Sequence, residues 1–205
     1  MHLHEALSAI AAQLGLDAAM LQDYAAEDTL GGYPEAWPCG SLWDGEGRTL
    51  YALVRALGPL NVLELGVHAG ASTTHLRSAV RDNGGGRVHS IDRWEGAGHM
   101  IPDDLFAHGW LTYADALAAI ADLPDNAIDF VFEDLCHGGG EVRDVIQALR
   151  PKLRPGAVVV HHDSEHGAEG IEVKRGLREA GVEFRSYALP PSDCGLALWR
   201  AGETQ

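Results

Sequence analysis

Apolar side chains near the start of the chain recur every three or four residues, as they do along one face of a helix. The positions are Leu3, Leu7, Ile10 and Leu14. Gly15 follows the last of them and predicts that the helix ends there. The sequence also predicts a short helix over 17–26, a loop rich in glycine and proline over 29–47, and a helix over 46–57.

From residue 61 onward, short apolar runs alternate with amphipathic stretches. Strands are predicted at 61–65, 87–92, 110–115, 127–134, 157–163, 182–188 and 195–200. Helices are predicted between them at 72–82, 116–123, 142–149 and 166–180, while 93–109 has no clean period and is predicted to be an insertion or a loop over the site. This alternation is typical of an α/β protein with a doubly wound, mostly parallel, Rossmann-like sheet.

Polar residues gather where the predicted strands end. In open α/β sheets, ligands bind beyond the carboxyl ends of the strands, close to the point where the strand order reverses. The residues in those places are 64–70, Asp92, Asp115, 134–137 and 161–164. The sequence therefore predicts one binding site at this edge of the sheet.

The size and charge of the chain narrow the choice of partner. With 205 residues, 46% of them hydrophobic, it can bury one sizeable core. We expect a single globular unit in which 1–44 form a helical cap segment on a main domain of 45–205. The 15 basic and 30 acidic residues give a formal charge of −15, which disfavours nucleic acid and anionic membranes as partners and favours a small molecule.

The cysteines and the hydropathy indicate a compartment. Cys39, Cys136 and Cys194 are odd in number and far apart, which favours reduced thiols over a disulfide framework. No apolar run approaches the length of a membrane span, and the first residues lack the basic start of a secretory signal. We therefore expect a soluble protein of the cytoplasm.

The stretch "NVLELGVHAGASTTHL" (61–76) predicts a buried strand, a tight turn and the start of a helix. Gly66 and Gly70 lie in the turn, and Ser72 and Thr73 open the helix. Glycines allow a ligand to approach the backbone, and a helix start offers free N–H groups. The dinucleotide fingerprint G-x-G-x-x-G needs a third glycine that this turn lacks, so a dinucleotide is disfavoured.

The turn "ELGVHAG" resembles motif I of the class I S-adenosylmethionine-dependent methyltransferases, E/D-x-G-x-x-x-G. Four later stretches resemble motifs of that family in the same order: "VHSID" with Asp92, "YADAL" with Asp115, "LPDNAIDFVFED" and "LRPKLRPGAVVVHHD". The resemblance covers about residues 45–200. It implies S-adenosylmethionine as the cofactor, N-terminal helices beside the methyltransferase sheet, and an antiparallel last strand.

The resemblance also implies roles for single residues. The family's acidic residue after the second strand accepts hydrogen bonds from both ribose hydroxyls, which gives this role to Asp92. Asp115 falls where the family places the adenine, and Glu64 where a carboxylate orders the turn or meets the cofactor's amino group. The N–H groups at the helix start face the cofactor's carboxylate. The full set implied for the cofactor is Glu64, Gly66, His68, Gly70, Ser72, Thr73, Asp92, Asp115 and Asp134.

Within the superfamily, "FVFEDLCH" and "VVVHHD" resemble the small-molecule O-methyltransferases of the methyltransferase-24 and antibiotic-tailoring type. In metal-dependent members, the equivalents of Asp134, His162 and Asp163 bind magnesium, which holds two substrate oxygens and lowers the pKa of the one attacked. This chain has Cys136 at a second acidic position, and His162 where Asp or Glu is common. Histidine is a softer ligand than magnesium prefers, so zinc, iron or manganese is better suited, and the identity of the cation stays open.

Two mechanisms are open for methyl transfer to a hydroxyl of a small molecule. Either a divalent cation at Asp134, His162 and Asp163 activates the acceptor, or no metal takes part and His137 or His162 is the general base. His161 alternates with His162 along the strand and is expected to point the opposite way. The candidate catalytic residues are Asp134, His137 and His162.

Two other functions compete with methyl transfer. A metal-dependent hydrolase or oxygenase would use the histidine-rich stretch "HHDSEH" (161–166), but it would leave the complete cofactor motifs unexplained. A non-catalytic methyltransferase-like domain would bind the cofactor or a partner without turnover. A homodimer is expected only by analogy with the family.

Overall fold

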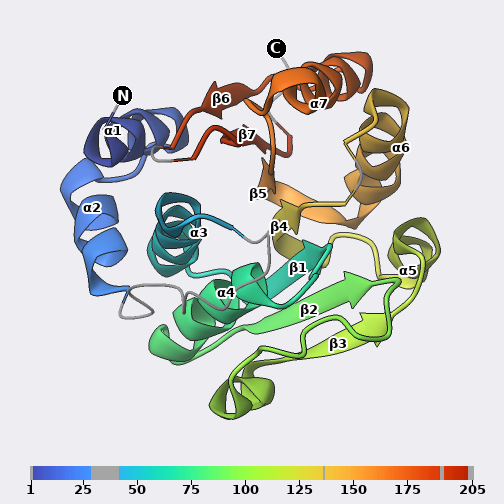
Figure 1. Ribbon diagram of the computed structural model, residues 1–205, viewed down its shortest axis with the longest axis horizontal. Coiled ribbons are helices and arrows are strands. Elements are labelled where there is room, and N and C mark those ends of the chain that lie inside the picture. Colours follow the sequence, from blue (N-terminus) through green and yellow to red (C-terminus); the bar gives the residue numbers. More distant parts are fainter. Residues whose placement is uncertain (1, 29–41, 136, 190–191, 203–205) are drawn as a thin grey trace.

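One sheet forms the centre of the computed structural model, which describes residues 2–28, 42–135, 137–189 and 192–202 (Figure 1). The strand order is β3-β2-β1-β4-β5-β7-β6, and among these strands only β7 runs in the direction opposite to the others. The strands are β1 (Asn61–Leu65), β2 (Arg87–Asp92), β3 (Gly109–Tyr113), β4 (Ile128–Glu133), β5 (Leu153–His161), β6 (Arg185–Tyr187) and β7 (Leu196–Arg200). The expected doubly wound, mostly parallel sheet with an antiparallel last strand is confirmed.

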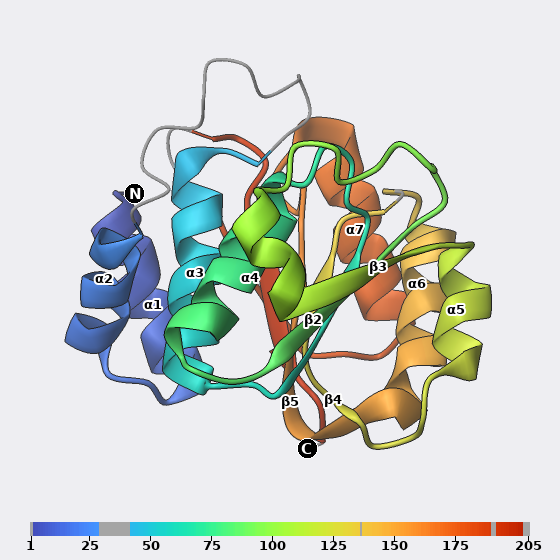
Figure 2. The same cartoon turned by 90° about the horizontal axis from the view of Figure 1, so that it is seen from below.

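Helices cover both faces of this sheet (Figures 1 and 2). One side carries α1 (Leu3–Leu14), α2 (Ala18–Glu27), α3 (Asp44–Leu57) and α4 (Ala71–Asp82), and the other carries α5 (Ala116–Asp122), α6 (Gly139–Leu149) and α7 (Gly167–Glu179). Two short 3₁₀ helices, η1 (Asp103–His108) and η2 (Arg150–Lys152), lie in the connections. Each helical layer encloses its own hydrophobic core against the sheet.

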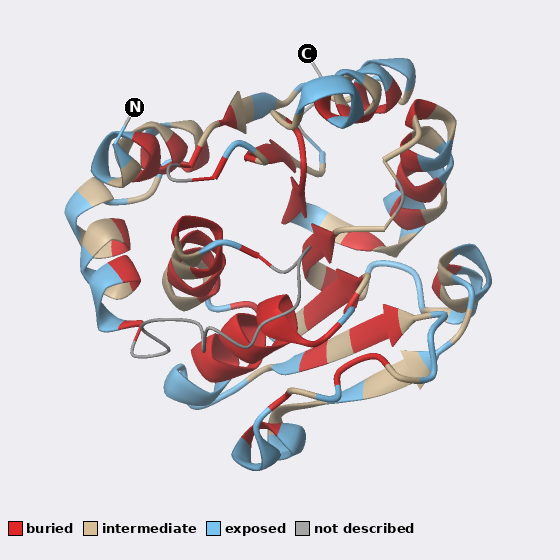
Figure 3. Cartoon of the chain, viewed as in Figure 1, coloured by how far each residue is buried: buried red, intermediate tan, exposed pale blue. Residues whose placement is uncertain are grey.

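The alternation of side chains along the central strands supplies both cores. Phe130 and Phe132 of β4 pack into the core under α1–α4, whereas Val131, between them, packs into the core under α5–α7. All three side chains are fully buried, and Figure 3 shows the central strands buried along most of their length. A strand buried on both faces reads as a continuous apolar run, which is why β1, β4 and β5 are prominent in the sequence.

The N-terminal helices belong to the core of the α1–α4 side. Leu7 and Ile10 of α1 are buried in it, and the Gln13 amide donates to the Leu198 carbonyl of β7 at 2.9 Å. Arg200 of β7 donates in turn to the Leu14 carbonyl at 2.7 Å. The helix ends at Gly15, whose φ of +64° is the left-handed conformation that a glycine adopts without strain.

Several predicted boundaries differ from the observed ones. β5 begins at Leu153, earlier than the predicted 157, because Leu153 pairs with Ile128 ahead of an irregularity in the register. β6 and β3 are shorter than 182–188 and 110–115, and the stretch 93–109 contains η1, anchored by the buried Leu105. Most of the predicted 29–47 loop lies outside the described residues. Within the described ranges, no helix is long and apolar enough to cross a membrane.

Candidate functional site

The glycine turn after β1 brings the ends of β1 and β4 together. The Asp134 N–H donates to the Leu65 carbonyl at 2.8 Å, and the Gly66 N–H donates to the Ile91 carbonyl at 2.9 Å. Gly66 has a φ of +88°, and a Cβ there would collide with the Asp134 carbonyl. Only glycine allows this close approach, which places Asp134 directly beside the turn.

Glu64 holds the turn from beneath. Its carboxylate is fully buried and accepts hydrogen bonds from the hydroxyls of Ser72 at 2.6 Å and Thr73 at 2.7 Å, at the start of α4. Burial raises the pKa of Glu64, although these hydroxyls oppose the shift. The structure therefore gives Glu64 the role of ordering the turn, and its carboxylate lies outside the cleft described below.

Asp92 at the end of β2 braces the same turn from the other side. One carboxylate oxygen accepts from the backbone N–H groups of Val67 at 2.9 Å and His68 at 3.1 Å, and the other accepts from Trp94 at 2.9 Å. Each carboxylate oxygen has two lone pairs, so one acceptor position remains, on Oδ1, for a ligand hydroxyl, where the resemblance implies two hydroxyls. Asp92 thus links the turn to a cleft that opens beside it.

That cleft has a volume of about 280 Å³ and lies along the ends of β1, β2 and β4. Gly66, Asp92, Asp115 and Asp134 all line it, as does Ala114. Asp115 also caps α5, because its carboxylate accepts from the Ala118 N–H at 3.1 Å. Four residues predicted from separate strand ends therefore meet in one cleft.

A smaller hollow continues from the cleft toward α4. Val67, His68 and Ser72 line it on the side of the turn, and Asp134 lines both the cleft and the hollow. His68 has a φ of +49°, a conformation that non-glycine residues seldom adopt and that is found at ligand-binding sites. Gly70 packs against Ile101 and does not line either space.

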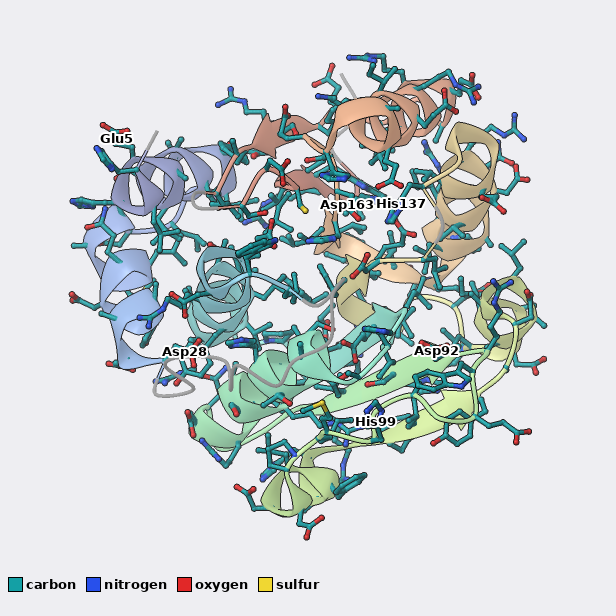
Figure 4. The ribbon with its side chains drawn as sticks, viewed as in Figure 1. Glu5, Asp28, Asp92, His99, His137 and Asp163 are labelled. Atoms are coloured by element: carbon teal, nitrogen blue, oxygen red, sulfur yellow. The ribbon has the colours of Figure 1, made fainter. Side chains whose placement is uncertain are left out.

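Beyond Asp134 lies a cluster of two carboxylates and two imidazoles, here called the inner cluster: Asp134, His137, His162 and Asp163. His137 Nε2 lies 3.5 Å from Asp134 Oδ1 and 2.9 Å from Asp163 Oδ2. His162 Nδ1 lies 3.3 Å from Asp134 Oδ1 and 3.2 Å from Asp163 Oδ2. Figure 4 shows His137 and Asp163 close together and Asp92 toward the end of β2.

Two nitrogens of the inner cluster lack hydrogen bonds of normal geometry within the described chain. His137 Nε2 and His162 Nδ1 are both buried, and each faces carboxylate oxygens without meeting that geometry. A buried polar atom without a partner is costly, so such an atom indicates a missing ligand or ion. Asp163 has a φ of +54°, which adds backbone strain at the same place.

Charge within the inner cluster shifts its titration strongly. The close carboxylates of Asp134 and Asp163 raise the pKa of His137 to about 10. Burial alone would lower the pKa of His162, but the charge of Asp134 raises it well above its ordinary value. Burial would likewise raise the pKa of Asp163, but His137 and His162 hold it far below its usual range. Without a cation, His137 is therefore protonated near neutral pH.

Glu46 of α3 is a residue of the candidate site that the sequence interpretation missed. Its carboxylate is completely buried, and His162 Nε2 lies 3.1 Å from Oε2. Oε1 accepts from the Ser192 hydroxyl at 2.7 Å and the Gly195 N–H at 3.0 Å. Since Nε2–H donates to Glu46, the Nδ1 atom of His162 is directed at the inner cluster.

His161 takes no part in this arrangement. It points to the opposite face, is completely buried, and lies with Nδ1 2.7 Å from Glu133 Oε2. Its Nε2 accepts from the Trp199 indole at 3.0 Å. The expected opposite orientation of the two neighbouring histidines is confirmed, and the stretch 161–166 does not form one continuous cluster.

Comparisons with known proteins support the same family. Residues 63–164 match the methyltransferase-24 model, described as a methyltransferase domain. Protein y4gI of Sinorhizobium fredii, itself uncharacterized, is 29% identical over 174 residues. That match covers 78% of this chain, but the chain spans only about a fifth (19%) of y4gI.

Solved structures share the fold at low sequence identity. An O-methyltransferase from Bacillus cereus in complex with SAH has a TM-score of 0.65 at 18% identity, covering 97% of this chain and 99% of that one. TomG from Streptomyces achromogenes, an O-methyltransferase of tomaymycin synthesis in complex with SAM, has a TM-score of 0.64 at 20% identity, with 98% and 100% covered. Residues 63–164 therefore belong to the methyltransferase-24 family of methyltransferase domains, and the sheet order and these likenesses give the chain the fold of the class I methyltransferases.

Proposed function

We propose that this chain transfers the methyl group of S-adenosylmethionine to a hydroxyl oxygen of a small molecule. The observation that carries the proposal is the meeting of four strand-end residues, Gly66, Asp92, Asp115 and Asp134, in one cleft that runs up to the inner cluster. The O-methyltransferases of Bacillus cereus and Streptomyces achromogenes, which share the fold, hold SAH and SAM.

The cleft and the hollow suit the parts of this cofactor. The adenosine would lie in the cleft, with a ribose hydroxyl donating to Asp92 Oδ1 and its adenine beside Ala114 and Asp115. The methionine portion would extend past Gly66 toward the hollow beside His68 and Ser72, where the start of α4 offers backbone N–H groups to its carboxylate; the hollow has a volume of only about 10 Å³ and must widen to admit it. The sulfonium methyl would then face Asp134, which lines both spaces.

The inner cluster fits a divalent cation. Two imidazole nitrogens, His137 Nε2 and His162 Nδ1, lack hydrogen bonds of normal geometry. Each lies 2.9–3.5 Å from the same two carboxylate oxygens, one of Asp134 and one of Asp163. Asp134, His137, His162 and Asp163 would hold the ion. Two imidazoles and two carboxylates favour manganese, iron or zinc over magnesium. When bound, such an ion lowers the pKa of an acceptor hydroxyl, so that a weak base suffices to remove its proton.

The residues of the chain then hold and orient the reactants. The acceptor oxygen forms a bond to the methyl carbon as the carbon–sulfur bond breaks, the electron pair returns to sulfur, and the hydroxyl proton passes to water. His137, with a pKa near 10 in the cation-free cluster, is protonated at neutral pH and is unsuited to remove that proton. We therefore assign His137 and His162 as ligands, oriented by Glu46 in the case of His162.

The test is calorimetric titration of metal-stripped protein with S-adenosylmethionine, without added cation and with manganese, zinc or magnesium. We expect micromolar affinity for the cofactor, weakened about tenfold or more in Asp92→Asn, since hydrogen bonds to charged groups contribute about 1.5–3 kcal/mol. Asp23→Asn, at an exposed position of α2, is the matched control. Turnover is followed as SAH release with catechols, which offer two adjacent oxygens.

Either of two results would contradict the proposal. The first is the absence of cofactor binding by the wild-type chain under every cation condition. The second is cofactor binding that Asp92→Asn leaves unchanged, because the ribose hydroxyls would then lie elsewhere. Binding without SAH release from any hydroxyl acceptor would instead favour the non-catalytic alternative.

A further inference from the structure

A second set of potential metal ligands adjoins the inner cluster on the outer side of Asp163. One ligand atom each from Asp163, His166 and Cys194 lies within 4.8 Å of the others. Cys194 Sγ and His166 Nδ1 are 3.8 Å apart. His166 precedes the first residue of α7, and its side chain makes no capping hydrogen bond and is 44% exposed, so this position opens to solvent while the inner cluster is largely covered.

Backbone hydrogen bonds hold the two segments that carry these ligands together. The Glu165 N–H donates to the Cys194 carbonyl at 2.6 Å, and the His166 N–H donates to the Asp163 carbonyl at 3.2 Å. The Cys194 N–H donates to the Ser192 hydroxyl at 2.9 Å, and that hydroxyl donates to the buried Glu46. The backbone that carries the thiol is thus held in place by the fold.

We propose that Asp163, His166 and Cys194 form a second metal position, the outer site, which takes a thiophilic divalent cation, zinc above all. Thiolate and imidazole are preferred zinc ligands, and three protein ligands with one open position are typical of accessible zinc sites. Zinc–sulfur and zinc–nitrogen bonds of about 2.3 and 2.0 Å at a tetrahedral ion place sulfur and nitrogen about 3.5 Å apart. The 3.8 Å separation needs only a small closure.

The outer site shares Asp163 with the inner cluster. A carboxylate has two oxygens, so one residue can bind a cation on each side, as carboxylates do in two-metal centres with ions about 3.5–4 Å apart. The exposed carboxylate of Asp193, whose Oδ1 lies 3.5 Å from His166 Nδ1, is in reach of the open position. Filling the outer site is expected to weaken cation binding at the inner cluster, because the two ions repel and divide one ligand.

Cobalt titration of the metal-stripped chain, under a phosphine reductant, tests the outer site. Cobalt replaces zinc and gives a thiolate charge-transfer band in the near ultraviolet only when a cysteine binds it. We expect two cobalt ions per chain, one of which produces the band. Cys194→Ser should lose the band and bind one cobalt ion fewer. His166→Asn, at a more exposed position, should lower the affinity for the band-producing ion about tenfold or more.

Further variants separate the two positions. Asp134→Asn should lower the affinity for the cobalt ion that gives no band and leave the thiolate band in place. Asp163→Asn should lower the affinity for both ions. Cys136→Ser is the matched control and should keep the band. A wild-type titration without a thiolate band, or a band that survives Cys194→Ser, would overturn the outer site. Failure of S-adenosylmethionine binding would overturn the proposed function and leave these cobalt results unaffected.

Discussion

The two halves of the candidate site are built in different ways. The half that faces the cleft comes from β1, β2 and the turn between β1 and α4, and its polar groups contact mainly backbone and hydroxyls. The half around the inner cluster combines α3, β4, β5 and the segment before β7, and its side chains contact one another. The first half follows from a local motif. The second depends on segments more than a hundred residues apart.

The largest expected effect tests the contact at which the halves join. In Gly66→Ala, the new Cβ would collide with the Asp134 carbonyl, so we expect a loss of about 3 kcal/mol or more in unfolding free energy, as for other severe steric changes. Gly156→Ala is the control: its φ of +83° is similar, but nothing lies within 4 Å. The strain of the left-handed backbone alone should lower the unfolding free energy of Gly156→Ala by about 1–2 kcal/mol. Equal losses in urea unfolding would show that the contact at Gly66 is unimportant.

A second variant tests the buried carboxylate that fixes His162. Glu46→Gln keeps the size of the side chain but offers an amide N–H₂ to the Ser192 and Gly195 donors or to His162. We expect cation affinity at the inner cluster to fall about 10–100-fold, as for other groups that orient a metal-bound histidine. Asp44→Asn, at a half-buried position on the same helix where the carboxylate pairs with Arg48, is the control in the same calorimetric titration. An unchanged affinity in Glu46→Gln would show that Glu46 supports only the fold.

The charge of the inner cluster predicts a distinctive pH dependence for the metal-free protein. The pKa of His137 is raised to about 10 by Asp134 and Asp163, with Glu169 Oε2 also 3.6 Å from its Nδ1. A group whose pKa is raised on folding contributes stability fully below its unfolded pKa of about 6.5, and that contribution is lost as the pH rises through about 10. The thermal unfolding temperature, measured in the presence of chelator, should therefore fall as the pH rises from about 6.5 to about 10.

His137→Asn isolates this contribution from other titrating groups. Its decline in unfolding temperature over the same pH range should be smaller than that of the wild type. Cation affinity should run in the opposite direction and rise with pH, because the ion displaces protons from the imidazoles. Parallel profiles for the variant and the wild type would show that His137 is not charged in the folded protein.

The smallest expected effect concerns Asp115 in the cleft, which is both a helix cap and a candidate contact for adenine. Asp115→Ala should cost about 1 kcal/mol of stability by removing the cap of α5, and Asp115→Ser should restore most of it. If Asp115 contacts the adenine, Asp115→Ser should still bind S-adenosylmethionine more weakly. Restored affinity along with restored stability would reduce Asp115 to a capping role.

The sequence predicted the half with the glycine turn well, for a physical reason. Gly66, Asp92 and Asp115 each follow a strand, and parallel strands end at the same edge, so spacing along the chain predicts their meeting in space. The sequence assigns Glu64 to the same cofactor site because Glu64 belongs to the glycine-turn motif. Its position within the strand, however, directs the carboxylate beneath the turn to Ser72 and Thr73.

The half with the inner cluster could be predicted only in part. Asp134, His162 and Asp163 also end strands, but Glu46 and Cys194 come from segments whose arrangement depends on tertiary packing. One signal for Glu46 was present, since it precedes Leu50 by four residues and therefore falls on the buried stripe of its helix. A charged residue on such a stripe indicates a buried partner, here His162.

The placement of Glu46 limits how this protein can be divided or recombined. The stretch matched by the family model, 63–164, carries the glycine turn and His162 but neither Glu46 nor the Ser192–Gly195 segment that Glu46 holds. A chimera that grafts only this stretch onto a foreign scaffold would retain the cofactor motif, while His162 would lose the acceptor that sets its tautomer. The unit to exchange therefore runs at least from α3 to β7.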